Sequence, residues 1–316
     1  MTDKSTDEPI FLVGSERSGT TLLRLMLDHH PKIAFHFESE FLVTPLAGGA
    51  DWPDLEDYYA MLELDRSFQE RPFEIDQSLD YPQLARSFLD QRRKQAGKPI
   101  VGATVHTDFD QLPRIWPNAR YIHIVRDGRD VARSAVKMGW AGHVWEGADR
   151  WIEAEQAWER FRGQLRDDQY TCLRFADLVR DPRGELMRIC RFIGVPFDEA
   201  MLAYPQSSSY DAPDPSMAFQ WKRKMDADQV RIVEARIGDM LVKRGYELSG
   251  HPPIEVDQRQ VRAFRRQSRW GRARFRIRRY GPALYLAEMI TRRLGLRGLN
   301  RCLVRRMNAI DDAHVK

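Results

Sequence analysis

The stretch FLVGSERSGTTLLRLMLDHHP begins at Phe11 and constrains the fold of this chain more than any other. A short apolar run leads into Gly14, Gly19 follows five residues later, and an apolar run with helical spacing continues to Pro31. The pattern predicts a strand, a glycine loop and a helix. It nearly matches the phosphate-binding loop G-x-x-x-x-G-K-[ST], except that Thr20 stands at the lysine position. The stretch therefore predicts an anion site at a helix N-terminus.

The missing lysine indicates which anion the loop can hold. In kinases and ATPases the loop lysine reaches the β- and γ-phosphates, and Mg²⁺ shares their charge. Without it, a triphosphate would lose a main counter-charge. Backbone N–H groups, the hydroxyls of Thr20 and Thr21 and the guanidinium of Arg17 still suit a smaller anion, bound without a metal. The alternative is a plain strand–turn–helix corner with Arg17 in solvent.

The rest of the chain alternates strand and helix patterns. Further strands are predicted at KPIVGAT, at RYIHIV and at QYTCLRF, and helices at VARSAVKM, at PRGELMRICRFIG and over residues 226–244. Such alternation favours a parallel sheet covered on both faces. We therefore expect an α/β chain with a P-loop-like three-layer fold and a central parallel sheet.

Tryptophan and cysteine positions add expectations about the core. Trp151 and Trp158 lie seven residues apart on a predicted helix, which favours core packing. Cys172 and Cys190 lie in apolar patterns and are expected to be buried. With Cys302 far from both, neither a disulfide framework nor a metal cluster is indicated, and a reducing compartment fits.

A second stretch, RYIHIVRDGRDVARSAVKM, places Arg126 after a predicted strand and Ser134 eight residues later in a predicted helix. Together with RSGTT at residues 17–21, it resembles the sulfotransferases that use 3′-phosphoadenosine-5′-phosphosulfate (PAPS). In that family the first motif holds the 5′-phosphosulfate and the second holds the 3′-phosphate. The resemblance thus assigns the 3′-phosphate to Arg126 and Ser134. It assigns the 5′-phosphosulfate to Arg17, Ser18, Gly19, Thr20 and Thr21.

The resemblance extends over residues 9–248. The segment LRFADLVRDPRGELMRICRFIGVPFD is similar to the family's YEDL…DP…FLG segment, with Phe175 and Ala176 in place of Tyr-Glu. QWKRKM is similar to the late basic segment that closes over the nucleotide, and it adds Lys222 to the expected donor-binding residues. Within the family, this chain is most similar to the prokaryotic branch that resembles tyrosylprotein sulfotransferases. The resemblance implies sulfuryl transfer from PAPS, a co-substrate used without a metal, to a hydroxyl or, less favoured, an amine.

A general base should remove the proton of the acceptor hydroxyl. Glu38 stands where tyrosylprotein-type enzymes carry their glutamate, and His106 stands where cytosolic small-molecule enzymes carry a histidine. Both are candidates, they are not exclusive, and His36 is a third. An imidazole is suited to accept a proton near neutral pH. The lysine of the family's K-T-H pattern is replaced by Thr104, which leaves Arg17 with more of the leaving-group stabilisation.

Charge is distributed unevenly along the chain. Residues 258–316 contain 17 Lys and Arg against 3 Asp and Glu, so a segment of +14 follows a body of −10. We therefore divide the chain into a polar N-terminal tail (1–8), a sulfotransferase domain (9–256) and a basic amphipathic, helical C-terminal extension (257–316). The extension is either a solvated helix pair packed on the body or a contact for an anionic membrane surface or an acidic glycan or lipid. Nucleic acid is disfavoured, because no recognition motif accompanies the charge.

Further sequence features limit the cellular compartment and the functions that we expect. No apolar run approaches the roughly 18–20 residues that cross a bilayer, and the polar start MTDKSTDEP is unlike a targeting peptide. We expect a cytoplasmic enzyme, with peripheral contact at the inner membrane surface as an option. A P-loop nucleotide kinase or other NTPase is one alternative, against which the missing lysine argues. A non-catalytic nucleotide-binding protein is another. Whether the acceptor is a glycan, lipid, peptide or small molecule is left open.

Overall fold

The computed structural model of the chain describes residues 8–49 and 51–313. The chain divides into two compact units. Of the described residues, the first unit comprises 8–49, 51–131 and 150–224, and the second comprises 132–149 and 225–313. The whole sheet belongs to the first unit.

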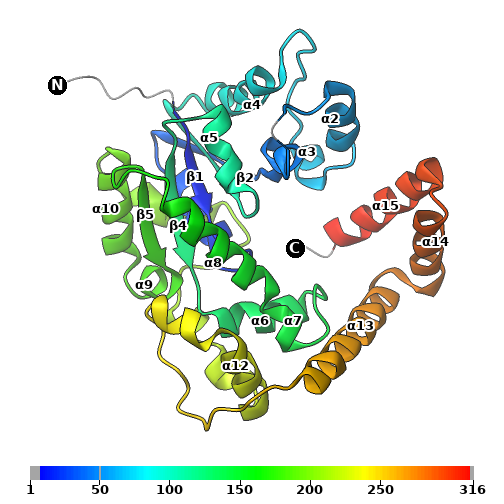
Figure 1. Cartoon of the computed structure of the whole chain (residues 1–316). Coiled ribbons are helices and arrows are strands. Elements are labelled where there is room, and N and C mark those ends of the chain that lie inside the picture. The colour runs from blue at the N-terminus through cyan, green and yellow to red at the C-terminus, as the bar shows by residue number, and fades with distance from the viewer. Residues whose placement is uncertain (1–7, 50, 314–316) are drawn as a thin grey trace. The chain divides into compact units, whose positions relative to one another are not determined.

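Five strands form one parallel sheet in the order β2-β3-β1-β4-β5 (Figure 1). Their bounds are β1 (Ile10–Val13), β2 (Ile33–Glu38), β3 (Ile100–Val105), β4 (Arg120–Val125) and β5 (Tyr170–Arg174). All four pairings are parallel. Because β1 is central, its carboxyl end lies between those of β3 and β4, where ligands bind in open α/β sheets.

The helices of the first unit are α1 (Thr20–Asp28), α2 (Leu55–Leu62), α3 (Arg66–Glu70), α4 (Tyr81–Ala96), α5 (Leu112–Ile115), α8 (Asp149–Arg162), α9 (Phe175–Arg180), α10 (Pro182–Ile193) and α11 (Trp221–Lys224). Helix α6 (Gly128–Lys137) begins in the first unit and ends in the second. The second unit contains α7 (Val144–Gly147), α12 (Ala227–Lys243), α13 (Gln258–Tyr280), α14 (Pro282–Arg293) and α15 (Arg297–Asp312).

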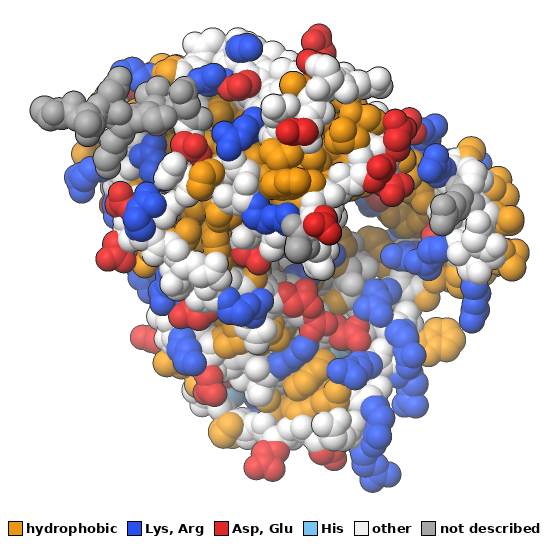
Figure 2. Space-filling model, turned by 45° about the horizontal axis from the view of Figure 1, so that its top comes forward, with side chains coloured by type: hydrophobic (Ala, Val, Ile, Leu, Met, Phe, Trp, Pro, Cys, Tyr) orange, Lys and Arg blue, Asp and Glu red, His pale blue; other side chains and the backbone are white. Residues whose placement is uncertain are grey.

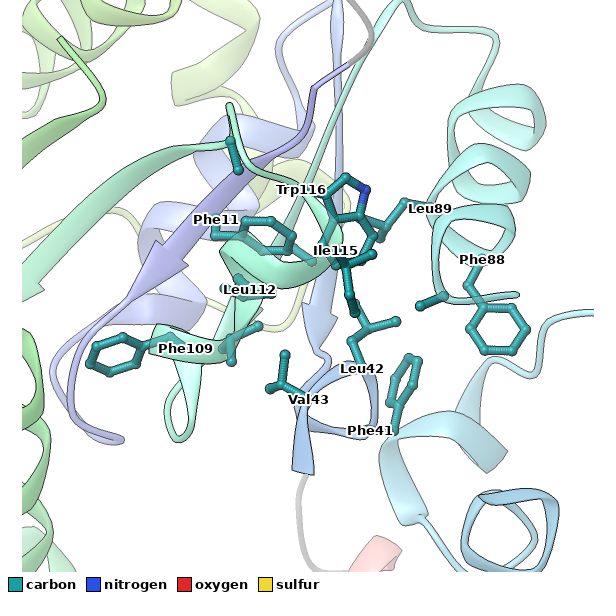
Figure 3. Close-up of a cluster of buried hydrophobic side chains, with 14 of the residues drawn as sticks. Phe11, Phe41, Leu42, Val43, Phe88, Leu89, Phe109, Leu112, Ile115 and Trp116 are labelled. Carbon is teal, nitrogen blue, oxygen red and sulfur yellow. The ribbon is translucent and has the colours of Figure 1, made fainter. Parts of the chain in front are cut away.

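Hydrophobic side chains cover the sheet on both faces. On one face, β1 packs against side chains of α2 to α5 and α8; Figure 3 shows Phe11 beside Trp116, with ring centroids 5.2 Å apart. On the other face, Leu12 packs with α1, α9 and α10. Trp151 and Trp158 are buried, as predicted. The expected α/β fold with a central, covered parallel sheet is confirmed.

Strand β2 was not among the predicted strands, and it contains a β-bulge. His36 pairs with Ala103 and Glu38 pairs with Thr104, so that Phe37 is an extra residue in the ladder. Side chains alternate between the two faces of a strand. The bulge therefore places Glu38 on the side of Thr104 rather than on that of His36.

Strand β5 is the other edge of the sheet, and it corrects one prediction. Cys172 lies in β5 and is exposed, whereas the apolar pattern predicted a buried thiol. An edge strand has a neighbouring strand on one side only, so its apolar pattern does not ensure burial. Cys190 in α10 is buried, as predicted.

The C-terminal segment is helical from α13 to α15. In the second unit, the His143 ring stacks on Phe264 of α13 with centroids 4.5 Å apart. The N–H of Gly142 donates to Ser268 Oγ at 2.9 Å. Helix α13 thus packs against the segment around α7. None of the helices within residues 8–49 and 51–313 is long and apolar enough to cross a membrane.

Candidate active site

The loop between β1 and α1 is shaped by two glycines. Gly14 has φ +143°, and a Cβ there would lie 2.3 Å from the carbonyl oxygen of Ile124. Gly19 has φ +97°, and a Cβ there would lie 2.2 Å from the ring of Phe175. Both the backbone conformation and the close neighbours therefore demand glycine. The chain can turn tightly at the carboxyl end of β1 only because these positions lack side chains.

The start of α1 presents donors suited to an anion. Gly19 is its N-cap residue, no side chain caps the helix, and its first turn contains no acidic residue. The first four N–H groups of a helix have no partner within the helix. Ser18 adds a hydroxyl that is buried and has no hydrogen-bond partner among the described residues. Thr20 is buried and Thr21 is half-buried beside it. These groups fit a phosphosulfate at the positive end of the helix dipole.

Arg126 joins the two predicted motifs. It follows β4 directly, and its Nη1 donates to the carbonyl oxygen of Arg17 at 3.2 Å. Arg17 is exposed and adopts a left-handed conformation with φ 67°. Arg126 can reach the carbonyl oxygen of Arg17 because β4 lies next to β1 in the sheet. Ser134, the other residue of the second motif, lies in the part of α6 that belongs to the second unit.

The guanidinium of Arg126 is held by several neighbours. Its Nη2 donates to the carbonyl oxygen of Met217 at 2.6 Å and lies 3.4 Å from Asp130 Oδ2. Its Cζ lies 4.4 Å from the ring centroid of Phe175. The same ring borders Gly19, so one aromatic side chain supports both the glycine loop and the arginine. The side chain of Arg126 is therefore oriented before any ligand binds.

Asp130 anchors the segment that was expected to close over the nucleotide. Its Oδ1 accepts the N–H of Trp221 at 2.7 Å, and its Oδ2 accepts the N–H of Gln220 at 3.2 Å. Burial raises the pKa of Asp130, although Arg126 opposes the rise. Lys222, the predicted donor-binding residue of this segment, is exposed.

The indole of Trp221 is fixed as well. Its Nε1 donates to Asp127 Oδ2 at 2.9 Å, and the guanidinium of Arg129 lies 3.7 Å from its ring centroid. Arg129 in turn pairs with Asp127 at 2.6 Å. This buried cluster binds the segment around α11 to the turn between β4 and α6, next to Arg126.

His106 follows β3 and contacts the glycine loop. Its Nδ1 lies 2.9 Å from the carbonyl oxygen of Gly14. A carbonyl only accepts, so Nδ1 carries the proton and Nε2 of the neutral ring remains an acceptor. That tautomer suits a general base. His106 and Arg126 thus lie at opposite sides of the loop, since β3 and β4 flank β1.

Glu40 is a functional candidate that sequence reasoning missed. Its Oε1 accepts the backbone N–H of His106 at 2.8 Å. Burial is the main cause that raises its pKa, His106 acts against the rise, and Glu38 adds to it. The only signal was the second acidic residue of FHFESEF.

Glu38 ends β2 on the side of the sheet covered by α1. There it interacts electrostatically with Arg24, a residue of α1 whose pKa is lowered by burial while Glu38 acts to raise it. The Nε of Arg24 is buried and has no hydrogen-bond partner among the described residues. Glu38, Glu40 and His106 therefore form one group at the carboxyl ends of β2 and β3.

His36 differs from the other two candidate bases. Burial, followed by the positive charges of Arg92 and Arg71, lowers its pKa to about 3. Its Nδ1 lies 3.0 Å from Ser39 Oγ, which itself donates to Phe37. A group with so low a pKa is a weak base. Thr104, at the position of the expected lysine, is buried.

The glycine loop on a central parallel strand, with an arginine after the neighbouring strand, places the chain in the class of P-loop-like α/β proteins. The profile of the Sulfotransferase family matches residues 9–199. The chain therefore belongs to the sulfotransferase family, and it is a sulfotransferase with PAPS as co-substrate. The resemblance predicted from sequence is confirmed, and a nucleotide kinase is not favoured.

Relatives agree with this assignment. The chain is 26% identical to protein-tyrosine sulfotransferase 1 of Danio rerio over 271 residues, which cover 77% of this chain and 74% of the relative. It is 24% identical to omega-hydroxy-beta-dihydromenaquinone-9 sulfotransferase Stf3 of Mycobacterium tuberculosis (strain CDC 1551 / Oshkosh) over 309 residues, which cover 79% and 78%. The fold is similar to that of the sulfotransferase domain from the Synechococcus PCC 7002 olefin synthase, with a TM-score of 0.52, 21% identity and coverage of 76% and 95%.

Proposed function

We propose that this enzyme transfers the sulfuryl group of PAPS to a hydroxyl by in-line displacement, with its own side chains as the only catalysts. The acceptor oxygen forms a bond to sulfur while the bond from sulfur to the 5′-phosphate oxygen breaks. The acceptor proton passes to a base, and the negative charge passes to the 5′-phosphate of the product. The protein must stabilise that charge and hold the acceptor in line.

The glycine loop is proposed to bind the 5′-phosphosulfate. Four features support this proposal: the N–H groups at the start of α1, which no side chain caps, the buried hydroxyl of Ser18, the two glycines of the loop, and the side chains of Arg17, Thr20 and Thr21. Thr104 stands at the position of the family's lysine. Arg17 therefore has to stabilise more of the negative charge that develops on the leaving oxygen. The catalytic role of Arg17 is therefore leaving-group stabilisation.

The 3′-phosphate is proposed to bind Arg126, together with Ser134 of α6. A guanidinium can engage a phosphate in a bidentate manner, and Arg126 is already oriented by Asp130 and by the Phe175 ring. Lys222 would add positive charge from the segment that Asp130 anchors.

Either His106 or Glu38 is proposed to accept the acceptor proton. His106 is supported by its tautomer, which leaves Nε2 as an acceptor next to the loop. Glu38 is supported by its position on the α1 side of the sheet, which follows from the bulge in β2. The two residues lie at the ends of adjacent strands, so they can also act together.

The acceptor is proposed to be an alcohol or phenol, with an amine as the less favoured choice. The names of the two relatives specify a tyrosine, which is a phenol, and an omega-hydroxy dihydromenaquinone, which is a lipid with a hydroxyl. A glycan, peptide or small molecule fits the same chemistry. Residues 41–93 and 207–219 are the segments expected to form the acceptor pocket.

The contact between Arg126 and the Arg17 carbonyl is the observation that carries this proposal, because it joins the two phosphate motifs. Calorimetry with 3′,5′-diphosphoadenosine and a transfer screen with ³⁵S-labelled PAPS would test it. The screen should use lipid, glycan, peptide and phenol fractions, and we expect binding together with label in one fraction. Binding without transfer to any fraction would favour a non-catalytic nucleotide-binding protein. Absence of binding would refute the site.

A further inference from the structure

One face of α13 combines arginines with exposed hydrophobic side chains. The helix contains ten arginines and no acidic residue. Trp270 is 74% exposed and Ile277 is 42% exposed. They lie two helical turns apart on one face, and exposed arginines precede Trp270 there at spacings of three or four residues. We call this surface the arginine–tryptophan face, and it consists of Arg259, Arg262, Arg266, Trp270 and Ile277.

The opposite side of α13 is already used in packing. Phe264 stacks on His143, the hydroxyl of Ser268 accepts from Gly142, and Arg272 pairs with Glu146 at 2.8 Å. The helix therefore has a fixed inner side within its unit. Trp270 is therefore exposed even though α13 is packed against its own unit on the opposite side.

Hydrophobic exposure continues into α14 and the start of α15. Leucine and isoleucine side chains between 46% and 67% exposed follow at Leu286, Ile290, Leu294, Leu296 and Leu299. Figure 2 shows orange hydrophobic and blue basic side chains together on the right-hand side of the view, where Figure 1 has α13 to α15. Exposed hydrophobic residues that are scattered singly are ordinary, whereas such a concentration marks an interaction surface.

Charge identifies the partner. Residues 258–316 carry +14, and the remainder of the chain carries −10. Two copies of the chain that met through this same face would bring arginines into contact with their like. An anionic bilayer instead supplies negative charge for the guanidinium groups and an interfacial region that suits the indole of Trp270. Arginine stems can also cover apolar surface while their charged ends stay in the headgroup region.

We propose that the arginine–tryptophan face, together with the exposed side chains of α14 and α15, binds the surface of an anionic lipid bilayer. The contact is peripheral: the arginines lie among lipid headgroups and Trp270 enters the boundary between headgroups and acyl chains. Each basic residue at such a surface contributes about a fivefold increase in affinity at low salt, so three of them contribute about a hundredfold.

Co-sedimentation with vesicles tests this without any measurement of transfer, so its outcome is independent of the proposed reaction. The full chain should bind phosphatidylcholine vesicles that contain phosphatidylglycerol, and it should bind pure phosphatidylcholine at least about tenfold more weakly. Replacement of Arg259, Arg262 and Arg266 by Gln should reduce binding to the anionic vesicles by at least about tenfold. As a matched control, Arg160, Arg180 and Arg191, exposed in the first unit, are replaced by Gln, and binding should be kept.

A second variant addresses the tryptophan. Vesicles with brominated acyl chains should quench part of the fluorescence of the wild type, and Trp270→Phe should remove that part. Circular dichroism and thermal melting verify that each variant folds. Equal binding to neutral and anionic vesicles, or equal loss in both triple variants, would overturn the proposal. Concentration-dependent dimerisation without lipid that Trp270→Ser abolishes would assign this face to a second copy instead.

Discussion

The carboxylate of Glu40 accepts a hydrogen bond from the backbone N–H of His106 at 2.8 Å, and it does so in a buried position. This hydrogen bond holds His106, which follows β3, against Glu40, which begins the turn after β2. His106 is also bound through its ring to the carbonyl oxygen of Gly14. A candidate base is thus held from both sides, by one carboxylate and by the glycine loop.

Glu40→Gln and Glu40→Ala should have different effects. Gln keeps an oxygen for the N–H of His106, whereas Ala leaves that N–H unpaired and should lower the free energy of unfolding by about 1–3 kcal/mol. Burial raises the pKa of Glu40, so the native state binds a proton more tightly than the unfolded chain. Wild-type stability should therefore fall as the pH rises through the raised pKa, and Glu40→Gln should lack that fall. Urea unfolding over a pH series measures both effects; parallel curves for wild type and Gln variant would contradict this.

Arg126→Ala should weaken binding of 3′,5′-diphosphoadenosine by about 2–4 kcal/mol, because a charge-assisted contact to the 3′-phosphate is lost. Binding of adenosine 5′-phosphosulfate, which lacks the 3′-phosphate, should change little. Calorimetry with both ligands separates the two effects. Since Arg126 also pairs with Asp130, the melting temperature serves as a control. Equal losses for both ligands would mean that the arginine acts through the structure of the loop.

His106→Asn and Glu38→Gln should identify the base. The change at the true base should lower kcat by roughly 10²–10⁴, with nucleotide affinity retained. If the two residues share the proton, both variants should be slow. Steady-state kinetics, once an acceptor is known, together with calorimetry of the nucleotide, gives the answer. A loss below tenfold in both variants would exclude both assignments.

Gly19→Ala should abolish nucleotide binding. A Cβ at this position would lie 2.2 Å from the ring of Phe175, and the φ of +97° is strained for alanine. The ring would have to move, and it supports the guanidinium of Arg126. Calorimetry with 3′,5′-diphosphoadenosine measures the loss. Gly97→Ala is a suitable control, because this glycine also has positive φ but has no atom within 4 Å of the added Cβ. Retained affinity in Gly19→Ala would show that the loop is more adaptable than its contacts indicate.

His36→Phe should make the protein less sensitive to acid. The pKa of His36 is about 3 in the native state, mainly because of burial, and that of an unfolded histidine is about 6.5. Between these values the unfolded chain binds one more proton, so stability falls as the pH falls. The loss should reach on the order of 5 kcal/mol. Chemical denaturation at a series of pH values compares the slopes. A variant as acid-sensitive as the wild type would show that other groups cause the transition.

The parts of the fold that the sequence could predict are those with uniform patterns. Strand β4 was predicted with its bounds, since four of its six residues are aromatic or β-branched, and Asp127 and Gly128 follow soon after. Strand β2 was not predicted, because Ile33 is its only β-branched residue and polar residues occupy two of its last three positions. Its bulge depends on the pairing with β3, which is not local information. The exposure of Cys172 depends likewise on which strand lies at the edge of the sheet.

In the candidate site, too, the sequence predicted the features that depend on local spacing and missed those that depend on distant contacts. The glycine loop and Arg126 were predicted from motifs, because the spacing of glycines and of strand ends is local. Glu40 and Asp130 act through contacts with distant segments, the first with the end of β3 and the second with Trp221. Sequence spacing alone does not reveal such partners. The division of the chain at residue 256 remains a prediction.

The bulge at Phe37 has a consequence for how this family of chains can vary. Because Phe37 is the extra residue, its deletion would restore a regular ladder and leave Glu38 opposite Thr104, on the α1 side, whereas a regular strand that kept Phe37 would place Glu38 on the side of His36. The orientation of this carboxylate thus depends on how β2 pairs with β3 as well as on which residue stands at position 38. When homologous sequences are compared, a gap of one residue at Phe37 would mark a chain without the bulge that still presents this carboxylate to the α1 side.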